Sequence, residues 1–440
     1  MKTFRVGGLH PHEEKKSKDY AIELFPLPEK VVISTLQHLG TPSVPTVKKG
    51  DKVLVGDLIA KAQTVLSADI HSSVSGEVED VSPFIDIFGH KRLAITIKRE
   101  GDEWREDIKK GVNPKEIGAY EGLEIIEAIK KAGIVGLGGA TFPTHLKLSP
   151  RLGQIPEVLL INGIECEPYL TSDHRLMLEE APALLSGIRL LMKALKVDRA
   201  IIGIEANKKD AFEVIQKEAS QYNGITVELL ETRYPQGGER QLIQALVNKE
   251  VPAGKFPIDI GIVVQNVSTV YAVFEAVMKN KPLIERVVTV SGPLVSQAKN
   301  LRVRVGTSVR SLLEYCAVEF NQSMKVVSGG PMMGQCLYQL DSSINKGVGG
   351  ILCFPEPELP EVSSCIRCGQ CSSVCSMGLE PFLLEKLILK ERYDDAFKEK
   401  VLNCMECGSC SYICPAHRPL LEWIRAGKIN VRTLQSEKKR

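Results

Sequence analysis

The stretch that decides the domain organisation of this chain is a cysteine pattern that occurs twice near the C-terminal end. Residues 365–375 read CIRCGQCSSVC, and residues 404–414 read CMECGSCSYIC, followed by Pro415. Both runs have the spacing C-x2-C-x2-C-x3-C. Three cysteines spaced in this way can surround one face of an iron–sulfur cubane, while the fourth is directed elsewhere. The doubled run therefore predicts an iron–sulfur domain.

The spacing also predicts which cysteines bind together. Where two such runs occur, the last cysteine of each run ligates the cluster of the other run. The predicted ligands are Cys365, Cys368, Cys371 and Cys414 for one [4Fe–4S] cluster, and Cys404, Cys407, Cys410 and Cys375 for a second. The alternative is a zinc-stabilised scaffold, but zinc ribbons use two separated C-x2-C pairs. The pattern favours an electron-carrying protein.

The composition is that of a soluble globular protein with several domains. The 440 residues are 43% hydrophobic and 25% charged, enough for roughly three domains. A formal net charge of +2 gives no reason to expect a nucleic-acid partner. Most of the twelve cysteines lie in the two runs, which indicates a reducing compartment. No secretory signal or membrane span is recognisable, so we expect other subunits to hold the chain at any membrane.

The N-terminal part has a β pattern. Residues 1–40 predict an irregular, extended lead-in, and from Pro45 short apolar runs alternate with Gly-Asp turns. This alternation predicts a compact antiparallel β sandwich. The stretch resembles lipoyl and biotinyl carrier domains, which are barrel-sandwich hybrids. Those domains carry a modified lysine in a hairpin, but the segment between Gln63 and Ile70 contains no lysine, so we expect a structural role.

The middle of the chain alternates predicted helices and strands, which indicates a parallel α/β sheet. Polar or glycine-rich loops follow its strands: residues 136–147 read GLGGATFPTHLK, residues 162–168 NGIECEP, residues 234–240 YPQGGER and residues 265–269 QNVST. Open α/β sheets bind ligands outside the carboxyl ends of their strands. We therefore expect one shared pocket, in which glycines let backbone N–H groups approach a phosphate and Lys147 adds charge. Each loop by itself could also be an ordinary turn.

The rest of the chain completes the predicted architecture. Alternation with period two, together with one helix, predicts a small β-grasp domain, and a proline-rich acidic segment at 355–360 predicts a linker to a helical cysteine-rich domain. We expect an α/β multidomain protein with an N-terminal β sandwich (1–115), a Rossmann-like α/β domain (116–285), the β-grasp domain (286–354) and a helical two-cluster ferredoxin-like domain (355–440).

These motifs also occur in a known order. The loop at 136–147 is similar to the G-R-G-G-A-G-F-P-T-G-L-K loop of the flavin-carrying, NADH-oxidising subunit of respiratory complex I. The turns at 162–167, 234–239 and 266–269, a β-grasp (SLBB-like) domain and cysteine ligands follow in the same succession. The doubled cysteine run and the leading GGLHP at 7–11, with its β domain, differ from that subunit. They resemble the RnfC family of the Rnf-type ion-translocating ferredoxin:NAD+ oxidoreductase complex, over essentially the whole chain.

The resemblance implies FMN and NAD(H) as cofactors besides the two clusters. The residues implied to cradle the FMN are Gly136, Gly138, Gly139 and Lys147, and those completing its pocket are Asn162, Glu165, Asn266 and Thr269. Phe142 is implied to stack on NADH, with Glu167 and Glu239 near its ribose or nicotinamide. Gly237, in the second glycine turn, is a further cofactor-binding candidate.

The resemblance also implies an activity. It is electron exchange between NAD(H) and the clusters through FMN, in a membrane complex that couples ferredoxin:NAD+ oxidoreduction to Na+ or H+ transport. The implied partners are membrane subunits, including an iron–sulfur subunit that receives electrons from ferredoxin. The implied place is the cytoplasmic face of the membrane. A different acceptor, such as cobalamin or a selenoenzyme served by a soluble reductase, is the alternative.

Overall fold

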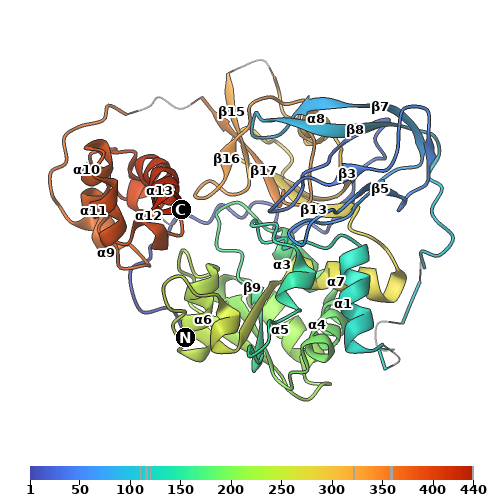
Figure 1. The fold of residues 1–440 in the computed structure, drawn as a ribbon, viewed down its shortest axis with the longest axis horizontal. Helices are drawn as coiled ribbons and strands as arrows, with labels where there is room; N and C mark the ends of the chain where they lie inside the picture. The colour runs from blue at the N-terminus through green and yellow to red at the C-terminus, as the bar shows by residue number, and fades with distance from the viewer. Residues whose placement is uncertain (110, 114–116, 119, 321–322, 357–359, 439–440) are drawn as a thin grey trace.

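The computed structural model of the protein describes residues 1–109, 111–113, 117–118, 120–320, 323–356 and 360–438. The predicted boundary between residues 115 and 116, and residues 357–359 of the predicted linker, lie outside the described residues. The described parts of the chain form four sheets (Figure 1). None of the helices in these parts is both long enough and apolar enough to cross a membrane.

The N-terminal part is a sandwich of two antiparallel sheets. One sheet consists of β2 (Lys30–Ser34), β8 (Lys91–Arg99), β7 (Gly76–Ile85) and β4 (Lys52–Val53), in that order; the other consists of β3 (Val44–Pro45), β5 (Leu58–Lys61) and β6 (Ile70–His71). Alternate residues such as Val31, Ile33, Ile95 and Ile97 point inward and are fully buried. The predicted sandwich is confirmed.

The prediction of an irregular lead-in over residues 1–40 is wrong for two segments. Residues 30–34 form β2, which pairs with β8, and Glu23–Leu24 forms β1, which pairs with β14 of the β-grasp sheet. In β2, buried and half-buried side chains alternate. Glycine and proline before this segment concealed a strand that is stabilised by pairing with a distant partner.

The α/β part contains a parallel sheet in the order β11-β10-β9-β12. Its strands are β9 (Val158–Gly163), β10 (Ala200–Glu205), β11 (Ile225–Leu230) and β12 (Ile262–Asn266). Its helices are α1 (Gly122–Lys131), α3 (Ser172–Glu179), α4 (Ala181–Leu195), α5 (Lys209–Ala219), α6 (Glu239–Val247) and α7 (Val267–Lys279).

Both faces of this parallel sheet are covered. Leu159 and Ile161 of β9 pack with α4 and α7 on one face, and Val158 and Leu160 pack with α6 on the other. Strands buried on both faces read as continuous apolar runs, as β10 does. In chain order the strands lie 3-2-1-4, so the order reverses between β9 and β12, where such sheets bind ligands. The Rossmann-like prediction is confirmed.

A mixed sheet follows. Its order is β1-β14-β13-β17-β15-β16, with β13 (Glu285–Ser291), β14 (Lys299–Arg304), β15 (Met324–Ser328), β16 (Gln335–Cys336) and β17 (Gly350–Pro355). The central strands β13 and β17 are parallel, and α8 (Val309–Tyr315) connects the two halves. This arrangement fits the predicted β-grasp fold.

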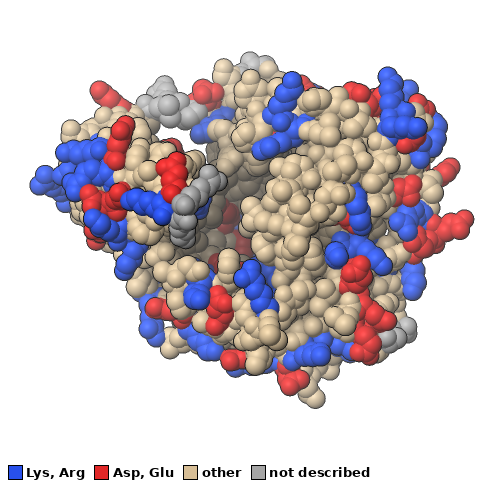
Figure 2. Space-filling model, viewed as in Figure 1, with Lys and Arg blue, Asp and Glu red and all other residues tan. Residues whose placement is uncertain are grey.

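The helical cysteine-rich part contains α9 (Gln370–Ser373), α10 (Pro381–Leu389), α11 (Tyr393–Lys398), α12 (Ser409–Tyr412) and α13 (Leu420–Glu437). Each cysteine run passes through a one-turn helix, α9 or α12. Figure 2 shows a hollow between this part and the rest of the molecule.

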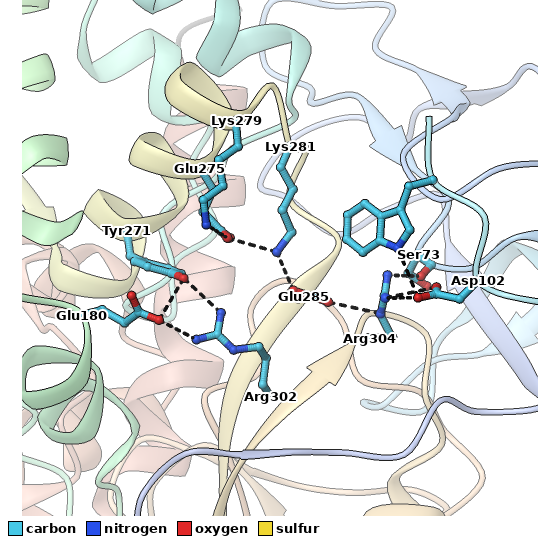
Figure 3. A network of polar contacts seen from close by, with 11 residues as sticks. Ser73, Asp102, Glu180, Tyr271, Glu275, Lys279, Lys281, Glu285, Arg302 and Arg304 are labelled. Carbon is cyan, nitrogen blue, oxygen red and sulfur yellow. Dashed lines mark hydrogen bonds and ion pairs between the residues drawn. The ribbon is translucent and has the colours of Figure 1, made fainter. Parts of the chain in front are cut away.

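Arginines of β14 join three parts of the molecule (Figure 3). Arg302 donates to Glu180 at the start of α4 and to the hydroxyl of Tyr271 in α7, at 3.1 Å each. Arg304 donates to the Ser73 carbonyl of the sandwich at 2.9 Å and pairs with Glu285. Because buried charges are costly unless they are paired, these contacts specify how the parts fit together.

Candidate functional site

The glycine-rich loop closes on itself just before α2 (Thr144–Lys147). Gly136 N donates to the Phe142 carbonyl at 2.8 Å, and Thr141 N donates to the Gly136 carbonyl at 3.1 Å. Gly139 is exposed at the tip, and its φ is +112°. A Cβ on Gly139 would meet nothing within 4 Å. The tip therefore offers open backbone that a ligand can approach.

This loop lies against the end of β12. Leu137 N donates to Thr269 Oγ1 at 2.8 Å. Asn266 caps α7, since its Oδ1 accepts from Ser268 N at 2.9 Å and Thr269 N at 3.3 Å. Asn266 is also the register partner of Asn162 on β9. The two predicted asparagines thus meet at the point where the strand order reverses, next to a helix N-terminus that favours an anion.

Two further predicted loops reach the same place. Asn162 Nδ2 donates to the Gly237 carbonyl at 2.9 Å. Lys147 Nζ pairs with Glu239 at 2.9 Å, and the two side chains are 32% and 42% exposed. The structure therefore gathers residues from four separate loops at one edge of the sheet, as the sequence predicts, and leaves a cation accessible there.

Glu165 and Glu167 turn their carboxylates away from the glycine-rich loop. Glu165 accepts from Asp173 N at 2.8 Å and His174 N at 3.1 Å, so it caps α3. Glu167 accepts from the N–H groups of Met332 and Met333, at 3.0 and 2.9 Å, in the turn between β15 and β16. Burial raises the pKa of Glu167 to about 7. The cofactor roles of these two acids stay predictions.

Sequence reasoning missed the residues that fix these loops from behind. Asp173 accepts from Asn266 Nδ2 at 2.6 Å, and burial, followed by the nearby Glu165, raises its pKa to about 6. Lys15 Nζ donates to the carbonyls of Glu165, Glu167 and Leu170 at 2.6–2.9 Å. Burial lowers the pKa of Lys15 to about 8. Nothing in a lysine-rich stretch so early in the chain indicates this long-range contact.

Neighbouring parts also hold the glycine-rich loop. Arg286 of β13, which is buried, donates to the Leu137 carbonyl at 3.3 Å. Lys346 donates to the carbonyls of Asp69 and Gly133 at 2.8 Å each. Leu39 N of the sandwich donates to the Thr141 carbonyl at 3.0 Å. The sandwich thus has a structural role at this loop.

The cysteines form two sets. The inner set lines one cavity together with apolar side chains such as Leu384, Leu421 and Ile424; its members are Cys375, Cys404, Cys407 and Cys410. A cavity lined by four thiols and apolar groups fits an iron–sulfur cluster. The described residues contain no three His, Cys, Asp or Glu side chains close enough to hold a single metal ion. The thiols thus surround a space and not a point.

The outer set is the more exposed one. Its members are Cys365, Cys368, Cys371 and Cys414. Cys371 and Cys414 pack with Leu420, whereas Cys365 and Cys368 lie at the surface. The crossed composition of each set, with Cys375 among the inner thiols, is the arrangement that the spacing predicts.

The inner set lies against the α/β part. Tyr234 Oη donates to the Cys407 carbonyl at 2.7 Å. A Cβ on Gly238 would lie 2.5 Å from Met405 Cε, so the two segments are in close contact. Gln241 Nε2 donates to the Ser376 carbonyl at 3.1 Å. The strand-end pocket and the inner cysteines are therefore neighbours.

Comparison with known families assigns cofactors to these sites. The RnfC barrel sandwich hybrid domain matches residues 2–102, the Nuo51 FMN-binding domain matches residues 129–275, and the 4Fe-4S dicluster domain matches residues 359–415. Fold and site together define an electron-transfer protein that binds FMN and iron–sulfur clusters. The predicted FMN and iron–sulfur chemistry is confirmed, and zinc is not the better interpretation.

Relatives identify the family, and each of those named here is the RnfC-type member of its complex. The chain is 44% identical over its whole length to that of the proton-translocating ferredoxin:NAD(+) oxidoreductase complex of Clostridium ljungdahlii, of which it covers 96%. It is 38% identical over 98% of its length to that of the Na(+)-translocating ferredoxin:NAD(+) oxidoreductase complex of Acetobacterium woodii, of which it covers 97%. It is 39% identical to that of the ion-translocating oxidoreductase complex of Rhodobacter capsulatus, covering all of this chain and 85% of that protein. The chain belongs to the RnfC family of ion-translocating ferredoxin:NAD+ oxidoreductase complexes.

A solved structure shares the fold. The NAD+-reducing [NiFe]-hydrogenase in the air-oxidized state superimposes with a TM-score of 0.55 at 20% identity, over 73% of this chain and 69% of that chain. At this identity the likeness concerns the fold alone.

Proposed function

We propose that this chain is a peripheral electron-transfer subunit that exchanges electrons between NAD(H) and two [4Fe–4S] clusters through FMN. It works within a membrane complex that couples ferredoxin:NAD+ oxidoreduction to Na+ or H+ transport. One observation carries the proposal: a single turn serves both sites. Tyr234 reaches the Cys407 carbonyl, and Gly237 of the same turn reaches Asn162 in the strand-end pocket.

The strand-end pocket supplies the groups that FMN needs. The exposed backbone of Gly138 and Gly139 and the N-terminus of α7 suit a phosphate. Lys147 adds the positive charge, and Asn162 and Asn266 orient the adjoining turns. FMN supplies the link between two-electron hydride transfer from NADH and one-electron transfer to clusters.

NADH binds on the open side of the same pocket. We assign Phe142 to stack on the nucleotide and Glu239 to contact its ribose or nicotinamide, with Glu167 behind them. Glu239 is 42% exposed, so it is accessible to a nucleotide. When a nucleotide or flavin binds, the ion pair between Lys147 and Glu239 rearranges, because both groups take new partners.

The two cysteine sets define an order. The inner set holds the cluster next to the flavin pocket, and the outer set holds the cluster at the surface. We place the electron-transfer partner at the exposed outer set; it is another subunit of the complex, with an iron–sulfur subunit receiving electrons from ferredoxin elsewhere in the assembly. The chain lies on the cytoplasmic face of the membrane. We retain the division into domains at 1–115, 116–285, 286–354 and 355–440.

The test is anaerobic purification with measurement of iron, sulfide and flavin per chain, followed by NADH oxidation with an artificial acceptor. The double variant Lys147→Ala and Glu239→Ala removes both charged groups of the pocket. We expect NADH oxidation to fall about tenfold to a hundredfold, because each lost charged hydrogen bond is worth about 1.5–3 kcal/mol.

A matched control exists at the opposite end of the sheet. Lys249 and Glu157 form an ion pair of the same length, 2.9 Å, on the surface beside the start of β9. The double variant Lys249→Ala and Glu157→Ala should retain activity. Strong NADH oxidation by the pocket variant, or equal losses in both variants, would refute the assignment of the pocket.

A further inference from the structure

The N-terminal segment, residues 2–17, is attached to the α/β part at several points, and we call it the strap. Lys2 pairs with Leu230 at the end of β11, and Leu9 and Tyr234 exchange two backbone hydrogen bonds of 2.9 and 2.8 Å. Further along, Tyr169 N donates to the Glu13 carbonyl at 2.8 Å, and the three carbonyl contacts of the next lysine follow. The strap is thus fixed on both sides of its middle.

The middle of the strap contacts the inner cysteines. Gly8 N donates to the Val374 carbonyl at 2.8 Å. At Gly7, where φ is +68°, a Cβ would lie 2.4 Å from the carbonyl carbon of Cys375. Such a distance is far below van der Waals contact, so only glycine permits this approach. In Figure 1 the blue N-terminal segment passes between the red helical part and the green α/β part.

One arginine connects this contact to the flavin side. Arg233 stacks its guanidinium over the buried Phe4 ring, 4.6 Å from the centroid, and donates to the carbonyls of Phe4 and Gly7. The next residue, Tyr234, donates to the Cys407 carbonyl. Two members of the inner set, Cys375 from one run and Cys407 from the other, therefore contact the same short unit of strap and β11 loop.

We propose that the strap is a positioning element for electron transfer, and that Gly7 sets how closely the inner cluster approaches the flavin pocket. The inference rests on the proposed function, because it needs FMN in the pocket and a cluster on the inner cysteines. The GGLHP motif at 7–11 then has a physical reason: its first glycine lets the strap touch the backbone of a ligand cysteine. Gly7 touches neither flavin nor cluster and acts through Cys375.

The variant Gly7→Ala tests the strap. The added methyl group must move the strap away from Cys375. A misplacement of about 1 Å can lower a rate about a hundredfold. In the full-length protein with reconstituted clusters, mixed with NADH without oxygen, we expect cluster reduction, followed by freeze-quench electron paramagnetic resonance, to slow about tenfold or more. Flavin reduction, followed by absorbance, should keep its rate, because the pocket is unchanged.

The matched control is Gly50→Ala. Gly50 also has a positive φ, +89°, but a Cβ there would meet nothing within 4 Å. It therefore carries the same backbone strain without the clash, and both its rates should equal those of the unmodified protein. A second variant, Gly8→Ala, decides the question if Gly7→Ala does not retain its iron. Its Cβ would meet the Arg233 side chain and the Phe4 ring and not the cysteine backbone; it should also slow cluster reduction selectively.

The outcomes separate two failures. If NADH reduces neither flavin nor clusters in the unmodified protein, the proposed function is wrong. If the unmodified protein transfers electrons and an iron-replete strap variant does so at the same two rates, the strap proposal is wrong and the proposed function stands. Equal slowing of both rates would also overturn the proposal, since it would show a general loss of structure.

Discussion

The two cysteine runs have the same local conformation and opposite surroundings. Gly369 and Gly408, which follow the second cysteine of each run, have φ angles of +77° and +78°. Each run then enters a one-turn helix. Yet a Cβ on Gly369 would meet nothing within 4 Å, whereas one on Gly408 would lie 2.6 Å from the Met332 carbonyl oxygen. Identical spacing thus gives identical turns, and tertiary packing alone makes one run exposed and the other enclosed.

The comparison is broken most severely by removing the cysteine that crosses between the runs. Cys375→Ser should eliminate the cluster held by Cys404, Cys407 and Cys410 and leave the cluster of its own neighbours intact. We expect about half of the iron and sulfide to be lost, because each cluster needs four thiolates. Iron and sulfide analysis, with electron paramagnetic resonance of the remaining cluster, measures this.

The control for this variant is Cys336→Ser, at an exposed cysteine outside both sets. It should retain all of the iron. Loss of the outer cluster in Cys375→Ser, with the inner cluster retained, would contradict the crossed ligands.

A matched pair of glycine variants measures how much the surroundings contribute. Both Gly369→Ala and Gly408→Ala strain a residue with positive φ, at a cost of about 1–2 kcal/mol. Only Gly408→Ala also forces a methyl group against a carbonyl oxygen, which adds about 1–3 kcal/mol. Anaerobic calorimetry should therefore show the larger loss of stability for Gly408→Ala. Equal losses would mean that the inner run is not held as closely as the geometry indicates.

The turn that encloses Gly408 also contacts a titratable group. Met332 and Met333 donate to Glu167, whose pKa is raised to about 7. An acid with a raised pKa stabilises the fold fully below its unfolded pKa, and this stabilisation is lost as the pH rises through about 7. Since the amide of Glu167→Gln does not titrate, the variant should gain about 2 kcal/mol relative to the unmodified protein between pH 5 and pH 8.

Thermal unfolding of both proteins at the two pH values measures this difference. A difference that does not change with pH would show that Glu167 titrates normally and that its carboxylate is well solvated.

Several features of the fold followed from local patterns. The turns after β9 and β12 were recognisable because polar residues follow apolar runs, and their meeting follows from the parallel register that pairs Asn162 with Asn266. Strand β2 was not recognisable, because its stability comes from pairing with β8, which lies far away in the sequence. Lys15 and Asp173 were missed for a similar reason: their partners are backbone carbonyls and an asparagine from distant segments.

The sequence by itself determined the chemistry of this protein. Cysteine spacing, glycine turns and strand-end polar residues are local, and local geometry limits what they can bind. Only the tertiary structure decided which cysteines are enclosed, which carboxylates face a ligand and what the N-terminal glycines contact. These depend on packing between segments hundreds of residues apart, such as Gly7 against Cys375. Spacing within one run does not encode that distance.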